Sequence, residues 1–241
     1  MYDYQNDSPF PVSEAKLSQM FTAVMSRVYL WMFLGLLTTT GAALATLYTP
    51  FFWQFLAAVP FGIWILFIAQ IALVIAIGRA AAKLSPGVAV ALFFGYAFLN
   101  GVTFSIIFLI YDLGTIFLAF GTTSILFAIL SVVGYTTKQD LSKWGGILFM
   151  GLIGLIVASV VNMFLANSAL DWIITYAGIL IFMGLTVYDT KRIKMMAVAA
   201  ATQEGDTAVV VSRIGILGAL RLYLDFINLF LYILRLFGRR R

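Results

Sequence analysis

Long apolar segments recur along this chain, and they constrain its fold more than any other feature. Six of them carry no charged residue and approach the ~20 residues that a helix needs to cross a bilayer. They occupy residues 28–47, 61–78, 88–111, 116–135, 145–165 and 172–188. A seventh, 218–237, is interrupted by Arg221, Asp225 and Arg235. Polar and apolar residues do not alternate as in a membrane barrel, so the sequence predicts an all-α protein with seven transmembrane helices.

The composition supports lipid as the solvent of this chain. Hydrophobic residues make up 63% of it and charged residues only 10%, whereas soluble domains are about 25% charged. Cysteine and histidine are both absent, which excludes disulfides, thiolate chemistry and imidazole bases or metal ligands. A response to pH near neutrality would therefore require a carboxylate.

The distribution of Lys and Arg predicts the topology. They occur before the first span and in every second connection, at the positions Lys16, Arg27, Arg79, Lys83, Lys138, Lys143, Lys191, Arg192, Lys194 and Arg213. The net charge of +5 is thus better explained by topology than by a nucleic-acid partner. We expect a cytoplasmic N-terminal segment over 1–27 and a transmembrane domain over 28–238. Seven crossings leave the basic tail, 239–241, outside, although the positive-inside rule places such charges in the cytoplasm.

Two aspartates are the candidate functional residues. Asp225 lies roughly 10 Å inside the seventh span at ~1.5 Å per residue, and Asp189 ends the sixth span on the same side. A charged Asp inside a span costs about 2.5–3.5 kcal/mol, so it usually faces a partner or a water path. Adjacent carboxylates would share one proton. Once deprotonated, they would repel each other and offer oxygen ligands to Ca²⁺.

Simpler interpretations of these residues remain open. Asp189 would be an interfacial residue if it paired with Arg192 or Lys191. Asp225 would form a structural ion pair if it bound Arg221, one turn earlier on the same helix face. Asn228 shares that face and either extends a polar stripe or hydrogen-bonds a neighbouring helix.

Three motifs carry a resemblance to a known family. The segments GLTVYDTKRIK (184–194), LYLDFINLFLYILRLFG (222–238) and GYTTKQDLS (134–142) closely resemble the Bax inhibitor family, in its bacterial inner-membrane branch. The resemblance covers nearly the whole chain. It implies a seven-helix bundle with a central last helix, and a pH-sensitive calcium leak in the bacterial inner membrane. The expected partners are lipid, calcium ions and protons, with no tightly bound cofactor and no enzyme activity.

The resemblance also assigns roles to residues. Asp189 and Asp225 match the family's carboxylate pair, which binds Ca²⁺ transiently. Arg79 is the best match for an arginine that latches onto this pair, and Lys83 is the substitute. Arg221 departs from the family pattern, and a cation one turn from Asp225 would weaken calcium binding.

Two other functions are alternatives to the channel. An intramembrane aspartyl protease also has a YD motif, here in 187–189, but its second motif, GxGD, is replaced by YLD at 223–225. A non-channel modulator of a membrane protease or another membrane partner would use the N-terminal segment as its contact site. Calcium flux in liposomes without any partner would distinguish a channel from a modulator.

Overall fold

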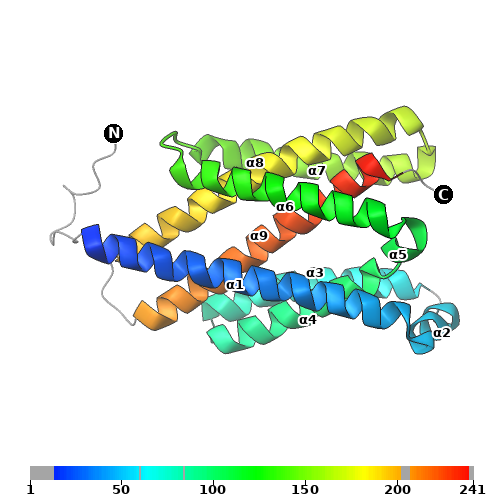
Figure 1. Cartoon of the computed structure of the whole chain (residues 1–241), viewed down its shortest axis with the longest axis horizontal. Coiled ribbons are helices and arrows are strands. Elements are labelled where there is room, and N and C mark those ends of the chain that lie inside the picture. Colours follow the sequence, from blue (N-terminus) through cyan, green and yellow to red (C-terminus); the bar gives the residue numbers. More distant parts are fainter. Residues whose placement is uncertain (1–13, 60, 84, 202–206, 239–241) are drawn as a thin grey trace. The chain divides into compact units, whose positions relative to one another are not determined.

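The computed structural model describes residues 14–59, 61–83, 85–201 and 207–238, and over these residues the protein is helical with no strand (Figure 1). The prediction of an all-α membrane protein is confirmed, because seven helical segments are long and apolar enough to cross a bilayer. The helices are α1 (Glu14–Leu47), α2 (Pro50–Ala58), α3 (Gly62–Lys83), α4 (Pro86–Phe104), α5 (Ile107–Ile110), α6 (Leu113–Thr136), α7 (Ser142–Leu165), α8 (Ser168–Ala201) and α9 (Thr207–Phe237).

The helices differ from the predicted apolar segments in several places. Three helices are longer than predicted, since α1 begins at Glu14, α3 continues to Lys83 and α9 begins at Thr207. The third segment, 88–111, is not one regular helix. It breaks after Phe104, where the Ser105 hydroxyl donates to the Val102 carbonyl and competes with the helical pattern. The connection predicted over 48–60 contains α2, which Pro50 begins at a position that suits proline. Finally, α8 continues past the charged residues after Asp189 through an Ala-rich stretch that favours helix.

The helices form two compact units. The first contains the described residues up to Ile106 together with Ile193–Leu220. Within it α4 packs against both α1 and α3. The α1–α4 contact is close, because a Cβ atom at Gly101 would lie 2.3 Å from the Thr39 carbonyl oxygen. Gln70 of α3 donates to the Thr103 hydroxyl of α4 at 2.8 Å, so this unit buries paired polar groups between its helices.

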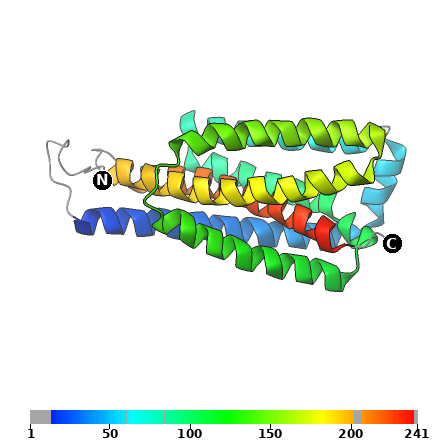
Figure 2. The ribbon, with the colours of Figure 1, turned by 90° about the horizontal axis from the view of Figure 1, so that it is seen from above.

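The second unit contains Ile107–Arg192 and the part of α9 that begins at Arg221. Its red segment of α9 lies between α6 and α8 (Figure 2), and ring contacts fix it on both sides. Phe226 packs edge-to-face on Phe127 of α6 at 5.4 Å between ring centroids, and Tyr232 stacks on Phe182 of α8 at 5.9 Å. These contacts place the second half of α9 against the helix that carries Asp189.

The last helix is the most buried of the seven. In an apolar stretch of 18 residues within this helix, 67% of the residues are buried. In the corresponding stretches of the other spans, at most 39% are buried. The expected central place of this helix in the bundle stays a prediction. α9 is continuous through Arg221, Asp225 and Arg235. Its full crossing and the membrane boundaries stay predictions. The basic tail, 239–241, and the first thirteen residues of the N-terminal segment lie outside the described residues.

Candidate functional site: a buried carboxylate pair

Asp189 lies on the buried face of α8. Phe182, Thr186 and Asp189 recur at helical spacing and are all buried, so α8 turns the carboxylate toward the interior of its unit. The Thr186 hydroxyl donates to the Phe182 carbonyl of its own helix, one turn earlier. Asp189 accepts its hydrogen bond from another helix instead.

Asp225 is buried more deeply, on α9. It retains only 4% of its surface, and its Oδ2 atom accepts no hydrogen bond from the described residues. Asp189 is close enough to interact with it electrostatically. The prediction that spans six and seven bring these two carboxylates near each other, away from bulk water, agrees with this arrangement. A buried acceptor without a donor carries a desolvation cost of about 1–3 kcal/mol, and more if it is charged.

The basic partner of the pair differs from the sequence-based interpretations. Arg221 Nη1 donates to Asp189 Oδ1 at 3.1 Å, so the arginine bridges to the neighbouring helix. The alternatives that paired Arg221 with Asp225, or Asp189 with Lys191 or Arg192, do not match this bond. Arg192 still adds an attractive positive charge to the surroundings of Asp189. The bridge forms because the long Arg221 side chain, 37% exposed, reaches across to α8.

Two carboxylates with one guanidinium limit the chemistry of this site. The Asp189–Arg221 pair nearly balances its own charge, which leaves Asp225 as the carboxylate that a proton or a cation would neutralise. No group of three or more His, Cys, Asp or Glu residues occurs together in the described part of the chain. The arrangement therefore suits transient contact with a cation better than a resident metal ion.

The other predicted residues are Asn228, Arg79 and Lys83. Asn228 donates to the Leu224 carbonyl of its own helix at 2.8 Å, and its part in a polar stripe stays a prediction. Arg79 is exposed near the end of α3, in the first unit, and Lys83 is the last residue of that helix. Their roles as a latch stay predictions.

A second ion pair joins the same two helices at their other end. Arg235 of α9 lies 3.5 Å from Asp171 of α8, and its guanidinium carbon lies 6.0 Å from the Tyr232 ring centroid. Sequence reasoning missed this pair, although the signal was present. Arg235 comes near the end of α9 and Asp171 near the start of α8, and antiparallel neighbours bring such ends together.

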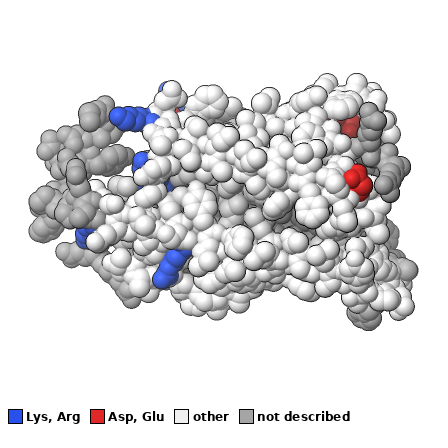
Figure 3. All heavy atoms as spheres, viewed as in Figure 1, with Lys and Arg blue, Asp and Glu red and all other residues white. Residues whose placement is uncertain are grey.

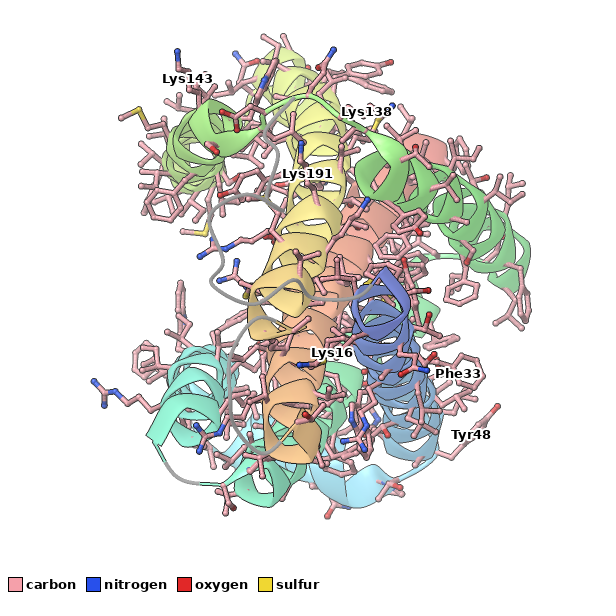
Figure 4. The ribbon with its side chains drawn as sticks, turned by 90° about the vertical axis from the view of Figure 1, so that its left-hand side faces the viewer. Lys16, Phe33, Tyr48, Lys138, Lys143 and Lys191 are labelled. Atoms are coloured by element: carbon pink, nitrogen blue, oxygen red, sulfur yellow. The ribbon has the colours of Figure 1, made fainter. Side chains whose placement is uncertain are left out.

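Several lysines of the second unit lie near the connection between α6 and α7. Figure 4 shows Lys138, Lys143 and Lys191 at the end where α6 connects to α7. Asp112 directly precedes α6, and Asp171 lies in the first turn of α8, and both helices start at the opposite end. On the face drawn in Figure 3, charged side chains occur only toward the ends of the helices. Outside the spans, the Ser142 hydroxyl and backbone N–H hold the pKa of Asp140 below its usual value.

Comparison with known proteins agrees with the resemblance seen in the motifs. The family described as inhibitor of apoptosis-promoting Bax1 matches residues 22–241. The inner membrane protein YbhL of Escherichia coli K12 is 44% identical over 217 residues, which cover 90% of this chain and 92% of YbhL. An uncharacterized protein of Deinococcus radiodurans is 37% identical over 95% of this chain and 96% of its own length. One from Rickettsia prowazekii is 36% identical over the full length of both chains. The expectation from the motifs is thus confirmed, and the chain belongs to the Bax inhibitor family.

Proposed function

We propose that this protein is a pH-sensitive calcium leak channel of the bacterial inner membrane, with its N-terminus in the cytoplasm. The observation that carries the proposal is the buried pair of Asp189 and Asp225, in which Asp225 has one oxygen without a donor. Intramembrane carboxylates of this kind are rare and usually mark an ion or proton path. Membership of the family and the similarity to YbhL, an inner membrane protein of Escherichia coli, support the location.

The shared proton explains the response to pH. When the pair holds a proton, the neutral acid and its carboxylate partner hydrogen-bond and keep α8 and α9 together. When the proton leaves as pH rises, two like charges in low dielectric repel each other and open the contact. Arg221 and Arg192 are the positive groups that oppose this repulsion. Calcium flux should therefore rise from acidic to neutral pH.

Arg221 is the latch that the geometry favours. Its bond to Asp189 joins α8 to α9. A charge-assisted hydrogen bond of this type contributes about 1.5–3 kcal/mol. An incoming Ca²⁺ competes with the guanidinium for the Asp189 oxygens, so opening and cation entry are coupled.

The test is calcium flux into vesicles that hold the purified protein, measured with an entrapped indicator across a pH series. We expect Asp225→Asn to give low flux that does not depend on pH, because the amide cannot ionise. Asp171→Asn is the matched control, since Asp171 is the more exposed acid of an ion pair between the same helices. Unchanged pH dependence in Asp225→Asn would reject the gating mechanism. A silent wild type that co-purifies with a membrane protease would instead support the modulator.

A further inference from the structure

Three helices of the second unit each bury a side-chain oxygen that has no hydrogen-bond partner. In the described part of the chain these atoms are Ser131 Oγ on α6, Thr190 Oγ1 on α8 and Asp225 Oδ2 on α9. The residues expose 5%, 0% and 4% of their surfaces. Buried polar atoms are nearly always paired, so three unpaired oxygens in one small unit call for an explanation.

Nearby hydroxyls show that lack of a partner is not a general property of these helices. Thr123 of α6 and Thr186 of α8 are also fully buried, and each donates to the carbonyl of its own helix one turn earlier, at 2.7 Å. Helical Ser and Thr satisfy themselves in this way by default. Ser131 and Thr190 could make the same bond, yet their hydroxyls do not.

Packing of α6 brings the three oxygens to one region. Phe127, Ser131 and Gly134 share a face of α6 at helical spacing. At one end of this face Phe127 contacts Phe226, the residue after Asp225. At the other end a Cβ atom on Gly134 would lie 2.9 Å from Thr190 Cβ. Ser131 therefore lies between two contacts of α6. One is with α9, next to Asp225, and the other is with α8, at Thr190.

We propose that Ser131 and Thr190 are specificity-determining residues whose hydroxyl oxygens, together with Asp225, bind a partly dehydrated divalent cation in transit. This inference rests on the proposed channel function and names the site that selects its cargo. The site is transient, because the cation must leave it again.

The chemistry of calcium favours such a set of ligands. Ca²⁺ takes about 6–8 oxygen ligands at roughly 2.3–2.6 Å in flexible geometry, and two carboxylates alone provide too few. Neutral hydroxyls add ligands without adding charge that would trap the ion. Mg²⁺ dehydrates reluctantly and requires near-octahedral geometry, so oxygens from three separate helices suit it poorly. The site should therefore favour Ca²⁺ over Mg²⁺.

The experiment compares Ca²⁺ and Mg²⁺ flux in the same vesicles for Ser131→Ala and Thr190→Val. Each variant should lower Ca²⁺ flux by about five- to tenfold, since one lost polar ligand is worth about 1 kcal/mol, while Mg²⁺ flux changes little. The pH profile should keep its midpoint, because both carboxylates remain. Thr190→Ser retains the hydroxyl and should restore the wild-type ratio of Ca²⁺ to Mg²⁺ flux.

Matched controls separate this role from simple packing. Thr123→Val and Thr186→Val remove buried hydroxyls that already bond their own helices, one on each of the same two helices, and they should leave the flux ratio unchanged. If Ser131→Ala and Thr190→Val behave like these controls while Asp225→Asn still abolishes pH dependence, the inference is wrong and the channel proposal stands.

A direct binding measurement keeps the inference testable if the wild type passes no Ca²⁺. Equilibrium dialysis with radioactive Ca²⁺ on the detergent-purified protein reports the site without flux. Weaker binding in Ser131→Ala and Thr190→Val, but not in the two control variants, would support the site even though the channel proposal had failed. Equal binding in all four variants would overturn it.

Discussion

Two ion pairs between α8 and α9 have the same chemistry in different surroundings. At each end an aspartate of α8 pairs with an arginine of α9, Asp189 with Arg221 at 3.1 Å and Asp171 with Arg235 at 3.5 Å. The two arginines are almost equally exposed, at 37% and 38%, but the aspartate side chains are 10% and 37% exposed. The buried pair has a second carboxylate, Asp225, beside it.

Burial, not residue type, therefore decides how strongly an ion pair interacts and whether it responds to a proton. The exposed pair is surrounded by high dielectric, where such contacts contribute about 0–1 kcal/mol and lose strength with salt. At the buried pair, a change of one proton alters interactions in low dielectric and involves three charged groups. We therefore expect the exposed pair, Asp171 with Arg235, only to hold the two helices together. We expect the buried pair, Asp189 with Arg221, to act as a switch.

The largest expected effect comes from removing Arg221, the partner of the buried Asp189. Arg221→Gln frees Asp189 from its bond and takes a competing cation out of the site. At mildly alkaline pH, where the carboxylates are ionised, we expect Ca²⁺ flux to rise about tenfold, in line with the loss of a charge-assisted hydrogen bond. The free energy of unfolding should fall by about 1–3 kcal/mol. Vesicle flux and thermal unfolding in detergent measure the two effects.

Arg235→Gln is the matched control for this variant, since it removes the arginine of the exposed pair. It should leave alkaline flux within a factor of about two, as its pair is worth less than 1 kcal/mol. Equal increases in flux from both variants would show that the two ends of the contact do not differ in function.

Packing beside the buried site should tolerate less change than packing near the exposed pair. A Cβ atom at Gly134 would lie 2.5 Å from the Val187 carbonyl oxygen, a backbone atom, so Gly134→Ala must push α6 away from α8. At Gly178 the added atom would meet the Tyr232 side chain at 2.6 Å, and a side chain can turn aside. We expect Gly134→Ala to destabilise the protein by about 1–3 kcal/mol and Gly178→Ala by less. Thermal unfolding decides, and a reversed order would contradict this contrast.

Much of the fold was predictable because the bilayer imposes one dominant rule, that each span is a long apolar helix. That rule identified all seven segments. It could not predict where α8 ends. Charged residues end an apolar span, but the helix itself continues through them and through the Ala-rich stretch that follows. The rule also missed the break after Phe104, which lies within a continuous apolar segment.

The candidate site was predictable only in part. Asp189 and Asp225 stood out because charge inside an apolar segment is costly and seldom accidental. The partner of Arg221 did not, since spacing along α9 pointed to Asp225, whereas the side chain bonds across to α8. Ser131 and Thr190 gave no signal in the sequence. Their hydroxyls differ from those of Thr123 and Thr186 only through packing against other helices.

Breaking the exposed ion pair should have a small effect that salt removes. Asp171→Asn is expected to lower the free energy of unfolding by less than about 1 kcal/mol in dilute buffer and by still less at ~1 M salt, where screening is strong. The pH profile of flux should not change. Thermal unfolding at the two salt concentrations provides the measurement. A salt-insensitive loss would indicate that this pair is effectively more buried than its exposure suggests.

The smallest effect is expected at Asp140, an acid that is fully exposed and so completes the series from buried to exposed carboxylates. The Ser142 hydroxyl donates to Asp140 Oδ1 at 2.6 Å and the Ser142 N–H at 2.9 Å, and these bonds lower the pKa of Asp140. Lys191 and Lys143 add a smaller effect in the same direction.

Ser142→Ala removes the hydroxyl bond, so the pKa of Asp140 should rise toward its usual value of about 3.9. Because the folded pKa is depressed, the stabilisation from these bonds is present above the unfolded pKa and is lost as pH falls through the folded pKa. The variant should therefore differ from wild type at neutral pH and converge with it in strong acid. NMR titration of the Asp140 carboxyl carbon in detergent micelles measures the shift. No shift would mean that the backbone N–H alone holds this carboxylate, and an altered flux profile would mean that exposure does not separate the acids of this unit by function.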